Sequence, residues 1–368
     1  LVRAGPSRGR FSVHGVGAAA PLITLRPVTP SPQRRPDTRT WPPAPDGILV
    51  VDKPFGWTSH DVVAKVRYLA RTRKVGHAGT LDPMATGVLV IGIGRATRLL
   101  TYVVGADKEY RATIRLGETT TTDDAQGEPV DAVDASGVTQ DAVRAGVARL
   151  TGDILQVPST VSAIKVEGKR AYALARSGES VVLDARPVTV SRFDVLEQRR
   201  VDVDGRVVLD VDVVVVCSSG TYVRALARDL GADLGVGGHL TALRRTSVGG
   251  YGVEEATLVD DLVEAAQERD EPLPVLPLAR AARAIMTARD LTDAEVVELL
   301  HGRWIARQGE DAGGPVAAIA PDGSLVAVVE VAGERLQPLA VLGTLEDLAA
   351  RTAGGPEPDR AGTPRGQE

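Results

Sequence analysis

One short stretch of the chain combines residues that could perform catalysis with residues that shape a loop. Residues 76–87 contain one histidine, one aspartate and two threonines among three glycines and a proline. Glycine adopts positive φ cheaply and proline fixes φ, so this composition predicts a tight, irregular loop. The apolar residues 88–93 predict a buried strand that anchors it, an arrangement typical of catalytic loops. From local features alone, however, turn formation is the commoner role of an aspartate such as Asp82.

The composition of the whole chain limits what that loop could belong to. Its 368 residues are enough for two domains with tails, and 43% hydrophobic with 25% charged residues is typical of a globular protein. The single cysteine, Cys217, excludes an intrachain disulfide and, with five histidines, gives no metal-ligand spacing. No apolar run approaches the roughly 20 residues of a membrane span. We therefore expect a cytoplasmic protein without a bound metal, membrane segment or signal peptide.

The charge is unevenly distributed, although the net charge is only −5. Residues 53–98 carry eight lysines and arginines against Asp61 and Asp82, whereas residues 112–158 are predominantly acidic. A basic zone around the loop is what a nucleic-acid backbone would require. A solvated basic helix face explains the same charges equally well.

The remaining sequence predicts the elements that must position the loop. Helices are expected from Ser59 as N-cap, at 95–100, 139–150 and 169–177, and from 218–224 to Leu230; strands are expected at 48–51, 108–117, 187–195 and 206–217, with an extended segment at 157–165. Strands and helices do not alternate as βαβ units, so we expect an α+β fold with a mainly antiparallel sheet flanked by helices.

The C-terminal part has a different pattern. A helix capped by Thr292 and short strands at 315–319, 325–331 and 336–341 predict a small β-rich domain. The predicted organisation is a disordered Pro/Arg-rich arm (1–45), a main domain (46–275), the β-rich domain (276–345) and a disordered tail (346–368).

Several separated stretches together resemble one family, the TruB family of bacterial tRNA pseudouridine synthases, which modify the T-loop uridine at position 55. The loop at 76–83 resembles its catalytic loop, and the other matching stretches are 52–54, 108–111, 158–165, 219–224 and 243–245. The resemblance covers residues 46–250 and implies the pseudouridine-synthase fold. The C-terminal domain resembles a PUA-type RNA-binding appendage in an actinobacterial form.

The resemblance implies an isomerisation in which the bond between uracil N1 and ribose C1′ breaks and C5 bonds to C1′, without a cofactor or metal. Asp82 would be the nucleophile, either adding at C1′ or helping to remove a proton from C2′. Arg224 would pair with Asp82 and keep it ionised. Tyr110 would stack on the uracil and take part in proton transfer at C5.

The resemblance also implies residues that bind the substrate. Tyr222 and Leu243 would contact the base, His77 would help to hold the flipped nucleotide, and Lys53 would contribute packing and charge. Without the family, Tyr110 would be interpreted as a core aromatic, Tyr222 as helix-start packing and Arg224 as a solvated helix residue. Candidate phosphate contacts are Lys65, Arg71, Arg73, Lys74, Arg95, Arg244 and Arg245.

The implied partner is the T arm of tRNA, recognised mainly by its shape, with the target base extruded into the enzyme. We expect a monomer that needs no guide RNA. One alternative is a guide-RNA-dependent synthase of the dyskerin type, which the acidic loop at 119–127 disfavours. Another is a non-catalytic tRNA-binding or tRNA-folding protein, against which the set of Asp82, Tyr110 and Arg224 argues.

Overall fold

The computed structural model describes residues 43–159, 165–166, 169–170, 183–268, 271–309 and 313–353. Most of the extended segment expected at 157–165 and of the helix expected at 169–177 lies outside these residues. The described part of the second range contradicts the helix, because β9 (Lys169–Arg170) pairs with β8 (Lys165–Val166) as a short antiparallel ladder.

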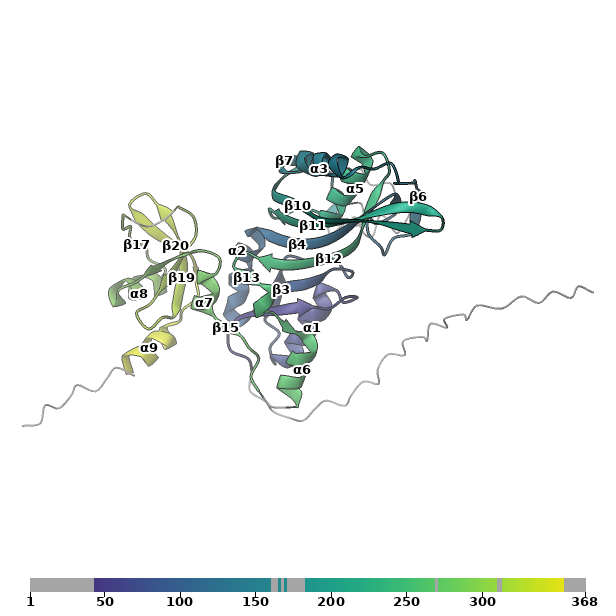
Figure 1. Cartoon of the computed structure of the whole chain (residues 1–368). Helices are drawn as coiled ribbons and strands as arrows, with labels where there is room; N and C mark the ends of the chain where they lie inside the picture. The colour runs from purple at the N-terminus through teal and green to yellow at the C-terminus, as the bar shows by residue number, and fades with distance from the viewer. Residues whose placement is uncertain are drawn as a thin grey trace, which may run out of the picture. The chain divides into compact units, whose positions relative to one another are not determined.

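A single large sheet organises the main domain (Figure 1). Its strand order is β14 (Thr257–Leu258), β1 (Gly47–Lys53), β3 (Thr86–Ile93), β12 (Gly238–Val248), β4 (Lys108–Leu116), β11 (Arg206–Cys217), β10 (Arg186–Val203), β7 (Gly152–Gln156). Three more strands pair at its side: β2 (Val75–Ala78) with β3, β13 (Tyr251–Gly252) with β12, and β15 (Leu276–Pro277) with β1. Among the described strands of this sheet, the pairs β1–β14 and β3–β12 are parallel and the others antiparallel. The expected α+β fold with a mainly antiparallel sheet is confirmed.

The helices pack at the two ends of this sheet. Figure 1 shows α3 (Gln140–Arg149) and α5 (Val223–Asp233) beside β10 and β11, and α1 (Ser59–Leu69) and α6 (Val259–Gln267) at the other end. Each pair shares an apolar core with its strands. The N-cap of α1 is Thr58 rather than Ser59, because Thr58 and Asp61 form a reciprocal capping box. Between the two ends lie a 3₁₀ turn at Gly94–Arg98 and α2 (Leu100–Gly105).

The central strand β12 was not expected from the sequence as one element. It lies between β3 and β4, and two β-bulges interrupt its register with β4. Bulges shift the alternation of inward and outward residues, and the pair Arg244-Arg245 further obscures the apolar pattern. This strand carries residues into the middle of the sheet, where Gly87 approaches the backbone of Arg245 so closely that a side chain on Gly87 would collide with it.

The C-terminal domain contains a five-stranded sheet in the order β16 (Thr287–Asp290), β18 (Val316–Ile319), β19 (Leu325–Ala332), β20 (Arg335–Val341), β17 (Ile305–Ala306). The helix α8 (Asp293–Leu300) begins after Thr292, as expected. The described range also includes α7 (Leu278–Arg283) and a terminal helix, α9 (Leu345–Ala353), which occupies part of the range 346–368 that the composition predicts to be disordered. A smaller ladder pairs β5 (Glu118–Thr120) with β6 (Pro129–Ala132).

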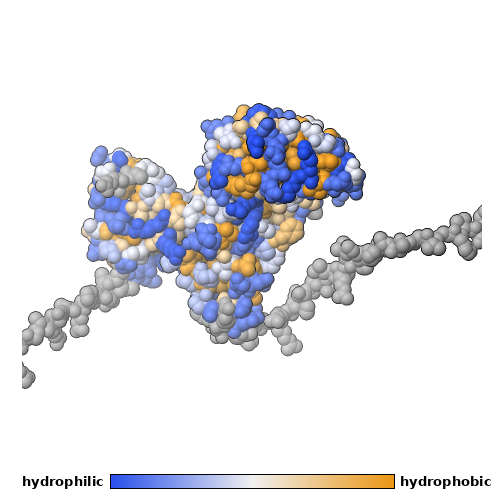
Figure 2. All heavy atoms as spheres, in the orientation of Figure 1, coloured by the Kyte–Doolittle hydropathy of each residue, from blue (hydrophilic) through white to orange (hydrophobic). Residues whose placement is uncertain are grey.

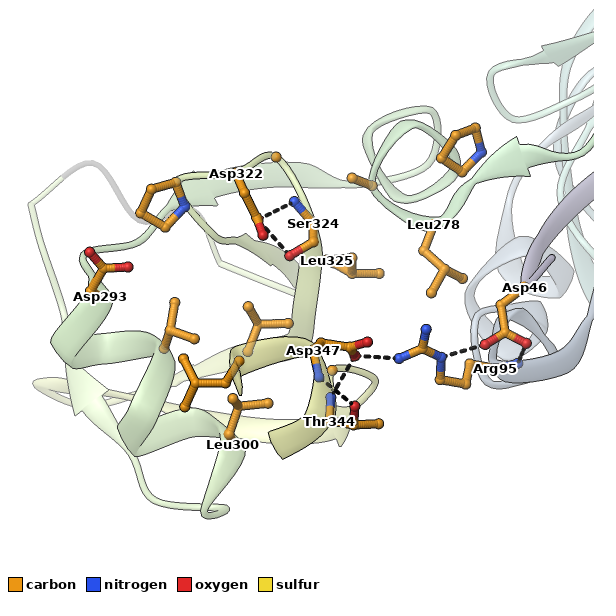
Figure 3. Close-up of a pocket in the computed structure, with 18 of the residues that line it drawn as sticks. Asp46, Arg95, Leu278, Asp293, Leu300, Asp322, Ser324, Leu325, Thr344 and Asp347 are labelled. Carbon is orange, nitrogen blue, oxygen red and sulfur yellow. Dashed lines mark hydrogen bonds and ion pairs between the residues drawn. The ribbon is translucent and has the colours of Figure 1, made fainter. Parts of the chain in front are cut away.

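The main domain and the C-terminal domain are joined by an apolar cluster and by two arginines, Arg95 and Arg98, the second of which donates a hydrogen bond to the Val341 carbonyl. Arg95 forms ion pairs with Asp46 and Asp347, the latter at 2.6 Å, and donates a hydrogen bond to the Leu342 carbonyl at 3.1 Å (Figure 3). A cavity of about 1210 Å³ lies beside this contact and is called the junction cavity below. Because two carboxylates already neutralise Arg95, the expectation that it binds phosphate is not supported.

In the view of Figure 2, hydrophobic residues lie in small patches between hydrophilic ones, as on the surfaces of globular proteins generally. None of the helices in the described part of the chain has the length and apolar character needed to cross a bilayer.

Candidate active site

The loop that carries Asp82 is pinned to the neighbouring helix and strand. Ser59, buried at the start of α1, donates to the Leu81 carbonyl at 3.2 Å and accepts from the Leu81 amide at 2.9 Å. Lys53 at the end of β1 donates to the carbonyls of Trp57 at 2.7 Å and Pro83 at 3.3 Å. These bonds fix both sides of Asp82. The irregular loop begins only after β2, so residues 76–78 belong to a strand and not to the loop as expected.

Asp82 lies against the buried arginine that the sequence pairs with it. Arg224, near the start of α5, places its Nε 3.0 Å from Asp82 Oδ2 and 3.6 Å from Asp124 Oδ2. Its side chain is only 4% exposed, and its Nη1 donates to the Thr122 carbonyl at 2.8 Å. The side chain of Asp82 is 39% exposed and that of Asp124 only 5%. Arg224 therefore holds one buried structural carboxylate and one that solvent and substrate can reach.

A cavity of about 250 Å³ opens beside Asp82, and we call it the Asp82 cavity. Five of the predicted site residues line it: Asp82, Tyr110, Tyr222, Arg224 and Leu243. They come from the β2–β3 loop, β4, β12 and the start of α5, so the fold gathers residues that are up to 161 positions apart (243 − 82). A space of this size suits one extruded nucleotide rather than a duplex.

The other two predicted site residues lie outside the lining of this cavity. Lys53 is fully buried and acts on the loop through its carbonyls; burial lowers its pKa to about 8, against the opposing charge of Asp82. His77 lies on β2, half-buried, with its ring 5.6 Å from that of His60. Burial lowers the pKa of His77, and among the described residues no group hydrogen-bonds its Nδ1. Because this Nδ1 is buried, the neutral imidazole suits packing contact with a nucleotide more than proton transfer.

The expectation that the two arginines of β12 bind phosphate is corrected by their surroundings. Arg244 forms a two-point ion pair with Asp52, at 3.0 and 2.6 Å. Arg245 is 1% exposed and lines the Asp82 cavity from below, so it cannot reach a backbone phosphate. Lys108, also buried, lines the cavity with it.

Sequence reasoning missed three residues that hold the site together. Ser59 was interpreted as a cap, Asp124 as part of an acidic loop, and Gln156 was not considered. The Gln156 amide accepts from the Tyr222 amide at 2.8 Å and donates to the Tyr222 carbonyl at 3.1 Å, which fixes the backbone where α5 begins. To identify Gln156, one would have to know that the end of β7 lies beside the start of α5, and local sequence patterns do not contain this contact.

The arrangement can support covalent or acid–base chemistry on a single base. It combines an accessible carboxylate paired with an arginine, a tyrosine at the cavity wall and buried basic side chains around them. Burial raises the pKa of the Tyr110 hydroxyl, so at neutral pH it is a hydrogen-bond donor and not a phenolate.

Comparison with protein families agrees with this geometry. Residues 67–223 match the model described as "TruB family pseudouridylate synthase (N terminal domain)". Residues 224–296 match "tRNA pseudouridylate synthase B C-terminal domain", and residues 286–343 match "tRNA Pseudouridine synthase II, C terminal". The three matches follow one another along the described domains.

Comparison with individual proteins gives the same result. The chain is 59% identical over 302 residues to the tRNA pseudouridine synthase B of Arthrobacter sp. (strain FB24), covering 80% of this chain and 96% of that protein. It is 56% identical over 296 residues to the tRNA pseudouridine synthase B of Thermobifida fusca (strain YX), covering 80% and 98%.

Among solved structures, the chain resembles protein chains of H/ACA complexes. A chain of the archaeal box H/ACA sRNP Nop10–Cbf5 complex superposes with a TM-score of 0.59 at 26% identity, covering 81% of this chain and 86% of that one. A chain of an H/ACA RNP bound to a substrate RNA containing 2′-deoxyuridine gives a TM-score of 0.59 at 25% identity, covering 81% and 85%.

Proposed function

The chain belongs to the TruB family and is an isomerase that forms pseudouridine in tRNA, and from this premise we propose that it acts on uridine 55 of the T loop with Asp82 as nucleophile. The observation that carries the proposal is the position of Asp82, ion-paired with Arg224 at the mouth of a cavity that fits one nucleotide. Residues 1–42, for which the structure gives no description, play no part in it.

The chemistry follows from the charges of the site. The carboxylate of Asp82 either adds at C1′ or helps to remove the C2′ proton, while the electron pair of the N1–C1′ bond leaves with the uracil. The base then turns and C5 bonds to C1′, either as the bond from Asp82 to C1′ breaks or as C2′ regains its proton from Asp82. The C5 proton is then lost and N1 gains a proton. Arg224 orients the Asp82 carboxylate toward the cavity, because its Nε lies 3.0 Å from Asp82 Oδ2.

The other site residues would bind the extruded nucleotide. Tyr110 stacks on the uracil and takes part in proton transfer at C5, while Tyr222 and Leu243 contact the base from α5 and β12. His77 contacts the flipped nucleotide, and Lys53 holds the loop at Pro83. Extrusion of the base costs a few kcal/mol, which stacking and hydrogen bonds in the cavity offset.

We further propose that the enzyme works in the cytoplasm as a monomer on the T arm of tRNA, without cofactor or guide RNA. The C-terminal sheet would act as a PUA-like RNA-binding appendage. The likeness to chains of H/ACA complexes favours a second candidate, guide-RNA-dependent modification. Against it stands the 59% identity to a protein named for tRNA over nearly its whole length.

The experiment that tests the proposal uses the purified full chain and an unmodified tRNA transcript, with no other RNA present. We expect one pseudouridine per tRNA, at position 55, mapped by chemical modification and sequencing. A transcript with cytidine at this position is the control and should remain unmodified. Conversion at another position would overturn the target assignment, and conversion only after addition of a guide RNA would establish the second candidate.

A further inference from the structure

The floor of the Asp82 cavity contains two buried cations with an unusual environment. Arg245 donates from Nε to the Val88 carbonyl at 2.7 Å and from Nη2 to the Gly79 carbonyl at 2.9 Å. Lys108 donates to the carbonyls of Val104, at 2.8 Å, and Ala106. In the described part of the chain neither forms an ion pair with a carboxylate, so only neutral groups, mainly backbone carbonyls, solvate both charges. We call Arg245 and Lys108 the basic floor.

Other buried arginines of the chain are compensated differently. Arg224 pairs with Asp82, and Arg289 in the C-terminal domain pairs with Glu295 at 2.7 Å. Removing a cation from water without an anionic partner costs several kcal/mol, and carbonyl dipoles offset this only in part. A fold that retains two such cations beside its active site gains from their charge when an anion forms there.

The register of the sheet brings the basic floor against Tyr110. Arg245 on β12 is directly opposite Tyr110 on β4, and opposite residues of antiparallel strands place their side chains side by side. Lys108 is two residues before Tyr110 and therefore on the same face of β4. Arg245 hydrogen-bonds the Tyr110 hydroxyl and opposes the rise in its pKa that burial causes.

The loop backbone is shaped to admit this arginine. Gly79 has a φ of +73°, and a Cβ built there would lie 3.3 Å from Arg245 Nη1 and 3.5 Å from Lys108 Cε. A side chain at this position would therefore be strained and would also crowd both cations. The glycine lets the loop that carries Asp82 rest directly on the basic floor.

We propose that the basic floor stabilises the negative charge of the detached uracil, with Arg245 as a positioning residue that holds the Tyr110 hydroxyl and the Gly79 carbonyl on one guanidinium. This inference rests on the proposed function. When the N1–C1′ bond breaks, its electron pair goes to the uracil, which becomes an anion while the Asp82 carboxylate loses its charge to C1′ or accepts the C2′ proton. The charge thus moves away from Arg224 and into the cavity above Arg245 and Lys108.

Tyr110 connects the floor to the base. An arginine N–H can only donate, so the phenol oxygen accepts from Arg245 and the Tyr110 O–H proton must point elsewhere. The cavity is the side to which this proton can turn, where it can donate to a carbonyl oxygen of the uracil anion. Arg245 would thereby set the orientation of the hydroxyl as well as polarise it.

The test compares Arg245→Gln, which removes the charge, with Arg245→Lys, which keeps it. We measure the single-turnover rate of pseudouridine formation at saturating tRNA, the dissociation constant for tRNA, and the folded fraction by circular dichroism. The expected result is a rate lowered about 100-fold in Arg245→Gln, with partial rescue in Arg245→Lys and tRNA affinity within about threefold of the unsubstituted chain. Equal rates in both variants would overturn the proposal, since a purely structural arginine would give no rescue by charge.

A matched control is Arg115→Met. Arg115 lies on β4, the strand that carries Tyr110, and is about 17 Å from Tyr110 by strand geometry. Arg115 forms a two-point ion pair with Asp210, so its loss should lower stability and leave the single-turnover rate unchanged. If Arg245→Gln does not fold, Lys108→Gln decides: it removes a floor charge without touching the bonds to Gly79 or Tyr110, and an unchanged rate would refute the proposal. If the unsubstituted chain itself forms no pseudouridine, the proposed function fails instead.

Discussion

Arg245 in the Asp82 cavity and Arg95 beside the junction cavity differ in how their positive charge is compensated. At the junction, in a space of about 1210 Å³, Arg95 is neutralised by Asp46 and Asp347, which come from the two domains it joins. In the Asp82 cavity, of about 250 Å³, Arg245 has only neutral partners among the described residues, namely two backbone carbonyls and the Tyr110 hydroxyl. Beside the larger cavity, the charge of Arg95 is neutralised by two carboxylates. In the smaller cavity, no carboxylate of the described residues neutralises the charge of Arg245, so this charge can interact with a bound anion.

This difference shows that charge compensation identifies the reactive site better than volume does. An ion-paired arginine at a half-exposed junction contributes little to stability beyond fixing the geometry of the contact, because water screens the pair and the opposite charges neutralise each other. A buried cation without a counterion creates a potential that a developing anion can use. The predictions below alter one of the two regions and ask whether the other responds.

The largest effect is expected from Asp82→Asn, which preserves the shape of the cavity wall and removes the proposed nucleophile. Pseudouridine formation should fall by at least about 10⁴-fold, as when covalent enzymes lose their nucleophile. The dissociation constant for tRNA should stay within a few-fold, since one exposed carboxylate contributes little to RNA binding. Asp347→Asn at the junction is the matched control, and its conversion rate should be unchanged. A normal rate in Asp82→Asn would refute the nucleophile assignment.

The next largest effect is expected from Arg224→Gln. The substitution leaves Asp124 buried without its ion pair, which should lower the free energy of unfolding by about 3 kcal/mol. It also removes the contact that orients the Asp82 carboxylate, which should slow single turnover about 100-fold. Denaturant unfolding and single-turnover kinetics measure the two effects separately. In Asp124→Asn, which leaves the contact with Asp82 in place, stability should change more than rate. The opposite order would mean that Asp124 and not Asp82 is the functional partner.

The sequence predicts the Asp82 site far better than it predicts the strand beneath it. Asp82, Tyr110 and Arg224 lie in short motifs whose resemblance to the TruB family implies their roles, although local features alone favour a turn residue, a core aromatic and a solvated helix residue. Arg245 was misjudged as a phosphate ligand because its burial depends on β12 pairing with both β3 and β4, over separations of more than 120 residues. Two bulges hide this strand from any local pattern.

The C-terminal half illustrates the same limit on a smaller scale. Strands β18 to β20 alternate around short turns and were predicted nearly to their ends. Arg95 was assigned to RNA because the sequence places it in a basic zone, and its partner Asp347 lies 252 positions away. The packing of the two domains decides which carboxylate pairs with which arginine. Local sequence propensities carry no information about this pairing.

A smaller effect is expected from Arg95→Leu at the junction. The arginine side chain is 31% exposed, so losing its ion pairs should lower the free energy of unfolding by only about 1 kcal/mol. If the junction only positions the C-terminal domain, the dissociation constant for tRNA should rise a few-fold while the single-turnover rate at saturating tRNA stays the same. A slower rate at saturation would contradict the division between a reactive cavity and a structural junction.

The smallest effects are expected from the two capping boxes, which repeat one motif in the two regions. Thr292 accepts from the Glu295 amide in the C-terminal domain, and Thr58 accepts from the Asp61 amide in the main domain. Substituting either threonine by alanine should cost about 1 kcal/mol of unfolding free energy.

The two caps should nevertheless differ in their effect on the reaction. Thr58 stands between Trp57, whose carbonyl binds Lys53, and Ser59, whose hydroxyl binds Leu81 next to Asp82. Thr58→Ala, which removes the cap of α1, should therefore slow single turnover a few-fold, whereas Thr292→Ala should leave the rate unchanged. Hydrogen exchange would show whether each loss of protection stays within its own helix. If Thr292→Ala slowed the reaction as much as Thr58→Ala, the C-terminal domain would be coupled to the Asp82 loop.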